Sequence, residues 1–261
     1  PSGFTTAGDR LFFVATTPAE GRELWCTDGT LEGTRLVRNL APGANASNPA
    51  DLVAWQGRLY FIAHDGRTRT LWSTDGTAEG TQTLMSSTTP REVRHLRLAG
   101  DRLCFEALEG YYPSHGYIWT SDGTPGGTQR TEPLRSGTNY LTITGYAGAP
   151  DPVIAIGRRI FFRRRDAFGL ETLWTSDGTA AGTFELPESR DVHPLDVGVF
   201  GGRFYYIGPG ESGDFRLFVS DGTSAGTHPI FDIGFPTAGT DFLFPRASAA
   251  AFSSSPPMPT T

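Results

Sequence analysis

The sequence predicts an all-β protein, a β-propeller of about five four-stranded blades, on three observations. The 261 residues include 33 glycines and 19 prolines, a content that excludes helical bundles and coiled coils. A segment ending in Asp-Gly-Thr returns five times, and an arginine followed by three apolar residues precedes its aspartate by 17 to 20 residues in every copy. Two landmarks in phase, with a period near that of a propeller blade, favour this fold over short solenoid repeats.

The Asp-Gly-Thr segment indicates a structural hairpin turn. Aspartate accepts hydrogen bonds from turn amides, glycine supplies a positive φ, and threonine is expected to open the next strand. One carboxylate per turn is too few for a calcium site, so we expect no metal. The turn resembles the Asp-box of sialidase propellers. Its repeated structural residues are Asp28, Asp75, Asp122, Asp177 and Asp221, preceded by Trp25, Trp72, Trp119 and Trp174 in the first four copies.

The arginine landmark begins a strand that is apolar on both faces. In Arg58–Ala63, Leu59 and Phe61 point one way and Tyr60 and Ile62 the other, as expected for a sheet stacked between two others. Recurrence favours a scaffold role for the arginines, either bonding a neighbouring blade's turn or pairing with the repeated aspartates. They are Arg10, Arg58, Arg102, Arg159 and Arg203.

Two cysteines are present, and neither belongs to a disulfide framework or a metal-binding pattern. Cys104 occupies an aromatic position of the strand pattern, which predicts a buried small hydrophobe. Cys26 and Cys104 fall in blades that are not neighbours, so we expect both to remain unpaired.

The repeat divides the chain into one predicted propeller domain, residues 1–252. Blades are expected near 3–40, 48–86, 91–134, 151–187 and 192–233, followed by a closing or extra segment at 234–252 and a Ser/Pro-rich tail or linker at 253–261. Residues 3–7 can supply the first strand of the first blade. Because the chain begins with Pro1, we expect a processed protein or an excised fragment. Six blades, or part of a larger ring, remain alternatives to five.

Glu23 to Thr30 matches the ELWxxDGT repeat residue for residue, and the chain resembles the bacterial secreted and surface proteins that carry it. The stretch from Leu36 to Pro49 is similar to the spacer between repeats in that family. The departures are Thr70, Tyr117, Thr172 and Arg216 in place of the glutamate, and Phe218 in place of the tryptophan. The resemblance implies a β-propeller located outside the cell or at its surface, with the signal peptide outside this chain, and it supplies no catalytic residues.

Charge and motif content exclude several function classes. The net charge is −6, without an extensive basic block, so nucleic acid is not an expected partner. No apolar run approaches the length that spans a bilayer. The five histidines lack ligand-like spacing and no catalytic motif is present, so we expect no enzyme and no cofactor. A carboxylate pair for glycoside cleavage stays an alternative, drawn from Asp65, Glu106, Glu109, Asp166 and Asp214.

Blade geometry assigns ligand binding to the irregular loops. The turns between first and second strands and between third and fourth strands are short and repetitive. The other connections vary and share the opposite face, where function is expected. Candidate ligand residues there are Tyr111, Tyr112, His115 and Tyr117 in the loop 109–117, Asn139, Tyr140 and Tyr146 in the connection 128–152, and Arg163, Arg164 and Arg165.

Each candidate group also has a structural interpretation. The aromatic residues suit sugar or peptide contacts, or they pack over the blade edge. The arginine run suits an anionic ligand, or more simply it is a solvated loop start neutralised by Asp166 and Glu171. The leading functional hypothesis is a non-catalytic extracellular recognition or adhesion module that binds glycan or a surface protein. The alternatives are a self-assembling structural module, as a homo-oligomer or polymer, and a glycan-cleaving enzyme.

Overall fold

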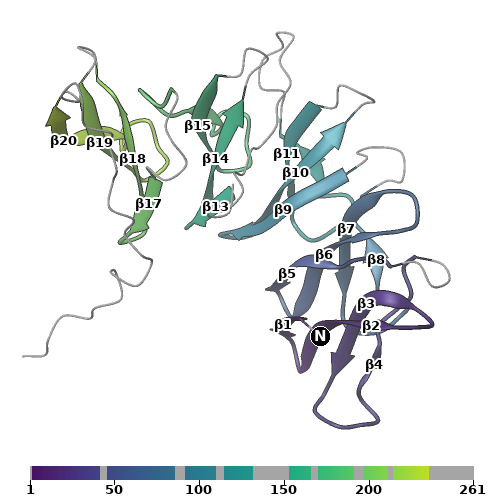
Figure 1. Cartoon of the computed structure of the whole chain (residues 1–261). Helices are drawn as coiled ribbons and strands as arrows, with labels where there is room; N and C mark the ends of the chain where they lie inside the picture. The colour runs from purple at the N-terminus through teal and green to yellow at the C-terminus, as the bar shows by residue number, and fades with distance from the viewer. Residues whose placement is uncertain are drawn as a thin grey trace, which may run out of the picture.

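A computed structural model confirms the all-β propeller. It describes residues 2–41, 46–85, 92–109, 115–131, 153–165, 170–190, 197–210 and 214–234, which contain strands and no helix. Figure 1 shows the five blades following one another along an arc from the N-terminus. No helix in this part of the chain has the length and apolar character needed to cross a membrane. The predicted segments 234–252 and 253–261 lie outside the described residues, apart from Gly234.

Each blade is a four-stranded antiparallel meander, with a fourth strand of only two residues in blades 1 to 4. The strands are β1 (Ser2–Ala7), β2 (Arg10–Thr17), β3 (Gly21–Thr27) and β4 (Arg35–Leu36) in blade 1; β5 (Ala50–Trp55), β6 (Arg58–His64), β7 (Arg69–Thr74) and β8 (Gln82–Thr83) in blade 2; β9 (Glu92–Ala99), β10 (Arg102–Glu109), β11 (His115–Ser121) and β12 (Gln129–Arg130) in blade 3; β13 (Val153–Ile156), β14 (Arg159–Arg165), β15 (Glu171–Ser176) and β16 (Phe184–Glu185) in blade 4; and β17 (Val197–Phe200), β18 (Arg203–Pro209), β19 (Phe215–Ser220) and β20 (His228–Gly234) in blade 5.

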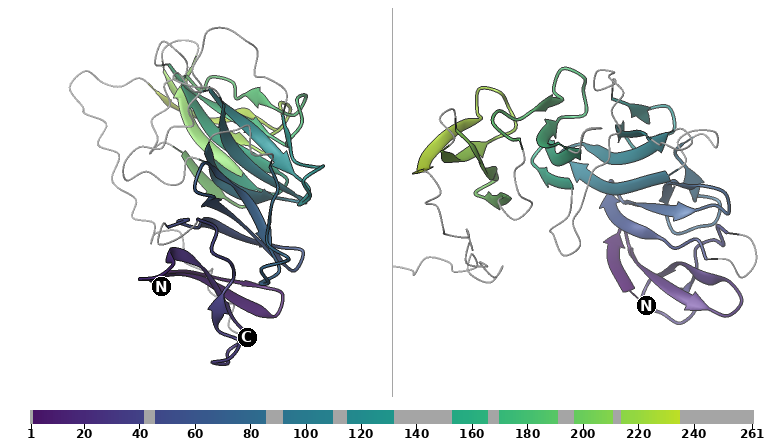
Figure 2. Two further views of the ribbon diagram at one scale, coloured as in Figure 1. Left: turned by 90° about the vertical axis from the view of Figure 1, so that its right-hand side faces the viewer. Right: turned by 45° about the horizontal axis from the view of Figure 1, so that its top comes forward.

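The blades stack through their first strands. Strand β1 contacts β5, β5 contacts β9, and β9 contacts β13, so the first strand of each blade lies on the inner side of the arc (Figures 1 and 2). Blades 2 and 3 are also joined by a single parallel pairing between Arg69 and Glu92. None of the closely packed pairs of described elements joins blade 1 to blade 5.

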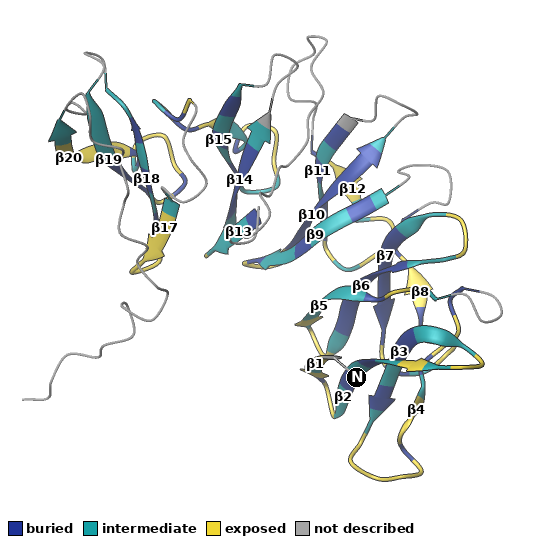
Figure 3. Ribbon diagram, viewed as in Figure 1, coloured by how far each residue is buried: buried dark blue, intermediate teal, exposed yellow. Residues whose placement is uncertain are grey.

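The core lies between successive sheets, as two-sided apolar strands predict. Phe12 and Val14 of blade 1 pack against Leu59 and Phe61 of blade 2. The opposite side of the same strand, including Tyr60, packs against blade 3. Figure 3 shows the central strands of blades 2 and 3 in the dark blue of buried residues.

Both cysteines are unpaired, as the repeat register predicts, and both are buried, as predicted for Cys104. Burial raises the pKa of the Cys104 thiol to about 12, so it remains protonated near neutral pH and acts as a small apolar side chain. Cys104 packs beside Ile118 and Ile160 at the interface of blades 3 and 4.

The Asp-Gly-Thr turn is the same hydrogen-bonded unit in all five blades. In blade 1, the amide and the hydroxyl of Thr30 both donate to Oδ1 of Asp28, at 2.9 and 2.7 Å. The Thr30 hydroxyl accepts from the Gly33 amide at 2.9 Å, and the Thr34 hydroxyl donates to the Thr30 carbonyl at 2.6 Å. The corresponding bonds recur in the turns that contain Asp75, Asp122, Asp177 and Asp221.

Two glycines of this turn are required for different reasons. Gly29 has a φ of 96°, as predicted, and its four counterparts also lie in the left-handed region. At Gly33 and its counterparts an added Cβ would overlap the carboxylate of the turn's aspartate. The expectation that the threonine opens the next strand is wrong: Thr30 bonds the aspartate at the centre of the turn, and β4 begins only at Arg35.

The repeated arginines serve the same turns. Arg159 donates to the Gly182 carbonyl at 3.1 Å and lies 3.6 Å from Asp177, both in its own blade. Arg58 makes the equivalent ion pair with Asp75 at 3.6 Å. The alkyl part of Arg159 meanwhile covers Gly222 of the next blade. In blades 2 and 4, therefore, the guanidinium pairs with its own aspartate, and in blade 4 the stem packs on the neighbouring turn.

The glutamate that precedes Leu-Trp in blade 1 stabilises the connection to blade 2. Glu23 is fully buried and accepts hydrogen bonds from the amide of Ser47, at 3.0 Å, and from its hydroxyl. Burial raises the pKa of Glu23, while these bonds and those from the backbone of Leu40 and Ala41 act to lower it. Glu23 therefore links strand β3 to the segment around Ser47.

Gly127→Ala should destabilise the protein by about 1–3 kcal/mol, because its Cβ would overlap the Asp122 carboxylate, which two bonds from Thr124 hold in place. Gly126→Ala is the matched control, since a Cβ there meets no atom within 4 Å and the stability should change by less than about 1 kcal/mol. Urea unfolding of both variants measures the difference. Equal stabilities would show that the close approach to Asp122 is not a constraint.

The aspartate turns should make the fold sensitive to acid. In four turns, hydrogen bonds from the threonine two residues later lower the pKa of the aspartate, which is Asp28, Asp75, Asp122 or Asp221. The pKa of Asp177 is also lowered: burial acts to raise it, but the bonds from Thr179 outweigh that effect. A carboxyl whose pKa is lowered on folding contributes stability above its ordinary value, and the contribution is lost as pH falls through the folded value. The melting temperature should therefore drop steeply below about pH 4. The raised pKa of Glu23 has the opposite effect on how stability depends on pH. A melting temperature unchanged between pH 5 and 3 would contradict the prediction.

Candidate functional site

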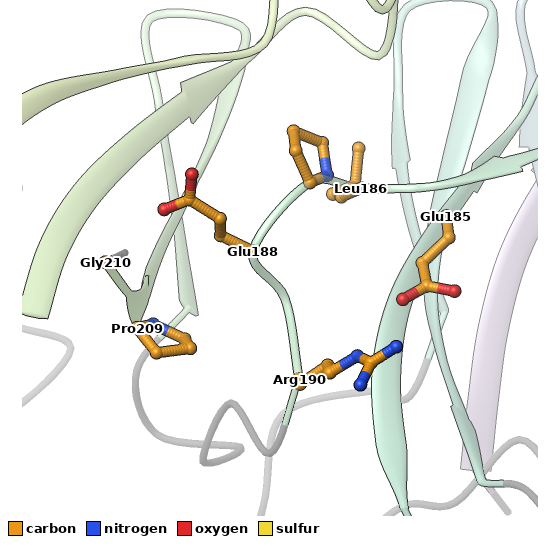
Figure 4. Close-up of a pocket in the computed structure, with 7 residues that line it drawn as sticks. Glu185, Leu186, Glu188, Arg190, Pro209 and Gly210 are labelled. Atoms are coloured by element: carbon orange, nitrogen blue, oxygen red, sulfur yellow. The ribbon is translucent and has the colours of Figure 1, made fainter. Parts of the chain in front are cut away.

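A cavity of about 420 Å³ lies at the junction of blades 4 and 5 (Figure 4). It is lined by Glu185, Leu186, Pro187, Glu188, Arg190, Pro209 and Gly210. The first five belong to the end of β16 and the connection that follows it; Pro209 ends β18, and Gly210 follows it. These are the fourth-to-first and second-to-third connections, so the cavity lies on the face predicted to bind ligands. Its volume is in the range of small-molecule sites.

The wall formed by residues 186–190 is fixed by hydrogen bonds to both blades. The Leu186 amide donates to the Leu173 carbonyl at 2.8 Å, and the Ser189 hydroxyl accepts from the Leu173 amide at 3.1 Å. The Tyr206 hydroxyl of blade 5 donates to the Pro187 carbonyl at 2.5 Å. The backbone between blades 4 and 5 is therefore held from each side.

A local backbone constraint shapes the same wall. Glu188 has a φ of 49°, in the left-handed region that non-glycine residues seldom adopt. Its carbonyl lies where a Cβ of Gly208 would be, so only glycine fits at that position. This close approach sets how near the connection lies to strand β18.

The polar groups of the cavity are two carboxylates and one guanidinium. Figure 4 shows Glu185 and Arg190 pointing toward one another, while Glu188 points the other way, toward blade 5. Oε2 of Glu188 is buried and has no hydrogen-bond partner among the described residues. Pro187 and Pro209 supply apolar surface beside these groups.

An acidic cluster adjoins the cavity in blade 5. Nε of Arg216 lies 3.3 Å from Oδ2 of Asp214 and 3.0 Å from Oδ1 of Asp232. Oδ1 of Asp214 is buried without a hydrogen-bond partner among the described residues. A Cβ on the cavity residue Gly210 would overlap that Asp214 oxygen. Carboxylate oxygens thus outnumber donors around the junction, an arrangement suited to ligand hydroxyl or ammonium groups. No cluster of three metal-ligating side chains occurs within the described ranges.

Most of the predicted aromatic ligand residues are not part of the described structure. Tyr111, Tyr112, Asn139, Tyr140 and Tyr146 lie outside the described residues.

The two remaining residues of the predicted aromatic loop belong to a strand. His115 and Tyr117 are in β11 and not in a loop, because Tyr117 pairs with Ala107 of β10. The Arg130 guanidinium covers the Tyr117 ring at 4.5 Å and bonds Glu109 at 3.0 Å. Tyr117 is therefore part of the blade edge.

The interpretation of the arginine run as a loop start is wrong. Arg163, Arg164 and Arg165 are the last three residues of β14, because pairing with β15 continues to Arg165 opposite Glu171. Arg163 is buried and lies 3.3 Å from Glu171. The Arg164 guanidinium lies 4.6 Å above the Trp174 ring. The guanidinium groups of Arg163 and Arg164 are thus engaged by the scaffold.

The candidate carboxylates for glycoside cleavage are engaged separately. Asp65 accepts from the amides of Arg67 and Thr68 within its own loop in blade 2. The buried Glu106 lies 3.2 Å from His95, Glu109 accepts from Arg130, and Asp214 accepts from Arg216. Asp166 lies outside the described residues. Each described carboxylate has its partner within its own blade.

Sequence reasoning missed Glu185, Glu188 and Arg190. No motif marks them, because the cavity forms only where two blades meet. A usable signal was the Gly-Pro-Gly stretch at 208–210, whose first glycine permits the close approach of Glu188.

No family model and no curated protein matches the chain. Among solved structures it is similar to a prolyl endopeptidase, with a TM-score of 0.49, 11% identity, and coverage of 88% of this chain and 34% of that one. It is also similar to the β-propeller domain of the trilobed protease from Pyrococcus furiosus (TM-score 0.46, 17% identity, coverage 88% and 70%). A GH74 xyloglucanase from Xanthomonas campestris is similar with a TM-score of 0.48 and 12% identity, over 85% of this chain and 36% of that one. The chain spans about a third of the prolyl endopeptidase's length.

Arg163→Ala should destabilise the protein by about 3–5 kcal/mol, because it leaves the buried Glu171 carboxylate without this cation. The double variant Arg163→Met/Glu171→Leu should recover most of the loss, since apolar side chains of similar size often replace a buried ion pair without cost. Chemical denaturation of the single and double variants measures both effects. A double variant no more stable than Arg163→Ala would contradict this account.

Proposed function

We propose that this chain is a non-catalytic recognition module that binds glycan on its variable-loop face, at the junction of blades 4 and 5. The observation that supports this most directly is the cavity lined by Glu185, Glu188 and Arg190 on that face. The opposite face consists of the short turns between first and second strands and of five copies of the Asp-Gly-Thr turn, whose polar groups already bond to each other. Ligand-binding capacity is therefore concentrated on the variable face.

The chemistry of the cavity fits a polyol. Carboxylates of Glu185 and Glu188 can accept hydrogen bonds from sugar hydroxyls, and the Arg190 guanidinium can donate to ring or hydroxyl oxygens. The apolar surface of Pro187 and Pro209 can pack against the C–H groups of a sugar. Few oriented polar groups beside an apolar wall are typical of small-molecule sites.

The proposal of a non-catalytic role is supported by how the candidate carboxylates are used. Glu23 is a buried carboxyl with a raised pKa, but its donors belong to the segment that joins blades 1 and 2. Glu106 and Glu109 have partners within blade 3. The ELWxxDGT resemblance supports an exported location, and Tyr111, Tyr112 and Tyr140 stay predicted contacts for a larger glycan on the same face.

A glycan array probed with the full chain tests the function, and calorimetry with the strongest-binding oligosaccharide tests the site. Glu185→Ala/Arg190→Ala should weaken binding by more than about tenfold, because both exposed side chains line the cavity. The matched control is Glu79→Ala, an exposed carboxylate in the blade 2 turn on the opposite face, which should bind as the native chain does. An array without binding overturns the glycan assignment, and unchanged affinity in the double variant overturns this location.

A further inference from the structure

Every blade interface uses the same two surfaces. The forward face of a blade carries the side chains that pack on the next blade, such as Phe12 and Val14 in blade 1. The rear face carries those that pack on the preceding blade, such as Leu59 and Phe61 in blade 2. Blades 1 to 4 use their forward faces and blades 2 to 5 use their rear faces. The forward face of blade 5 and the rear face of blade 1 pack on no other blade within the described residues.

The forward face of blade 5 is apolar and uncovered. Phe231 pairs with Leu217 and is 64% exposed. In the other blades, the counterpart of Phe231 is the residue that faces the equivalent leucine or isoleucine. These counterparts are only 1% to 7% exposed, and they are Val37, Leu84, Thr131 and Leu186. Phe200, which ends β17, is 67% exposed, and β17 is drawn largely in yellow in Figure 3. Exposed aromatic groups at positions buried elsewhere indicate an unfilled interface.

The rear face of blade 1 is uncovered in the same way. Phe4 is 63% exposed and packs beside Phe13, with ring centroids 5.8 Å apart. Phe13 is half-buried, whereas its counterparts Phe61 and Phe105 are fully buried. Blade 1 therefore presents the same apolar surface that blades 2 and 3 use against their predecessors.

The turn glycines show that the two free faces match. The left-handed glycine of each turn in blades 2 to 5 lies against side chains of the preceding blade, for example Gly76 under Arg10 and Gly222 under Arg159 and Phe161. Gly29 in blade 1 has no atom within 4 Å of its Cβ position. In blade 5, Arg203 and Tyr205 occupy the positions whose side chains cover the next blade's turn glycine at the internal interfaces. The aromatic pair Phe200 and Tyr205 corresponds to Trp55 and Tyr60, which cover Gly123.

Charge is complementary across the same contact. Within the chain, the bonds from Thr223 lower the pKa of Asp221 in blade 5 most, followed by the charge of Arg203 in the same blade and then by that of Arg159 in blade 4. Arg203 is the equivalent arginine on the free face of blade 5, and Asp28 is the equivalent aspartate on blade 1. The free faces therefore carry the equivalents of this arginine and this aspartate.

We infer that the forward face of blade 5 binds the rear face of blade 1 of a second copy of this chain, continuing the stack of blades from one molecule into the next. Within one chain the two faces lie at opposite ends of the arc (Figures 1 and 2), and their elements are not among the closely packed pairs. The contact is heterologous, with different surfaces on the two partners. It is independent of the proposed glycan site.

Sedimentation velocity of the full chain over micromolar to millimolar concentrations tests the inference. Phe231→Glu and Phe4→Glu each place a charge on one free face at an exposed position, so both variants should fold. Each alone should shift the association constant down by more than about tenfold. An equimolar mixture should form a one-to-one dimer and nothing larger, because each variant retains the face that the other lacks. Leu31→Glu is the control: it is exposed in the blade 1 turn at a position also exposed in the other blades, and it should assemble as the native chain does.

Three results would overturn the inference. A native chain that stays monomeric at all concentrations would show that the two faces close on one another or are covered within the chain. Self-association of Phe4→Glu equal to that of the native chain would show a contact between two copies of blade 5. A mixture of the two variants that remains monomeric would show that the faces do not bind each other.

Discussion

The structure depends on one hydrogen-bonded group, the aspartate Oδ1 that accepts from the amide and hydroxyl of the threonine two residues later. The bonds close the turn between the third and fourth strands and leave the carboxylate against the second glycine, where no Cβ fits. The first glycine, in the left-handed conformation, is the surface on which the preceding blade packs, as Gly76 is for Arg10. Folding of the hairpin and stacking of the blades therefore use the same few residues.

A turn repeated five times leaves little freedom on its own face, so the variation of the chain falls on the other connections. The cavity at blades 4 and 5 is one product of that freedom. Glu188 adopts a left-handed backbone, and Gly208 lacks the Cβ that would block it. A left-handed non-glycine residue also occurs at Asn48, in the connection between blades 1 and 2, but the other blades have no glycine at the position of Gly208. The regular turns thus supply rigidity, and an irregular connection supplies a site, which is the usual division between scaffold and loops.

The fold could be predicted from the sequence because its determinants are local. Alternation along Leu59–Ile62 and the positive φ of Gly29 depend on a few neighbouring residues, and both are as predicted. The ends of the strands were harder to predict, because cross-strand pairing that no local preference reveals holds Arg165 and Tyr117 in strands. The cavity could not be predicted, because it requires residues 185–190 and 209–210 to meet across two blades.

The two proposals reinforce each other through geometry. A stack continued from blade 5 of one copy into blade 1 of the next keeps the blades in the same orientation, so the variable-loop faces of both copies lie on the same side. Each copy then contributes one cavity to a common surface. Sites linked on one face bind a repeating polysaccharide with an effective concentration set by their spacing. Self-association through Phe231 and Phe4 would therefore raise the avidity of the site lined by Glu185 and Arg190 without any new contact to the sugar.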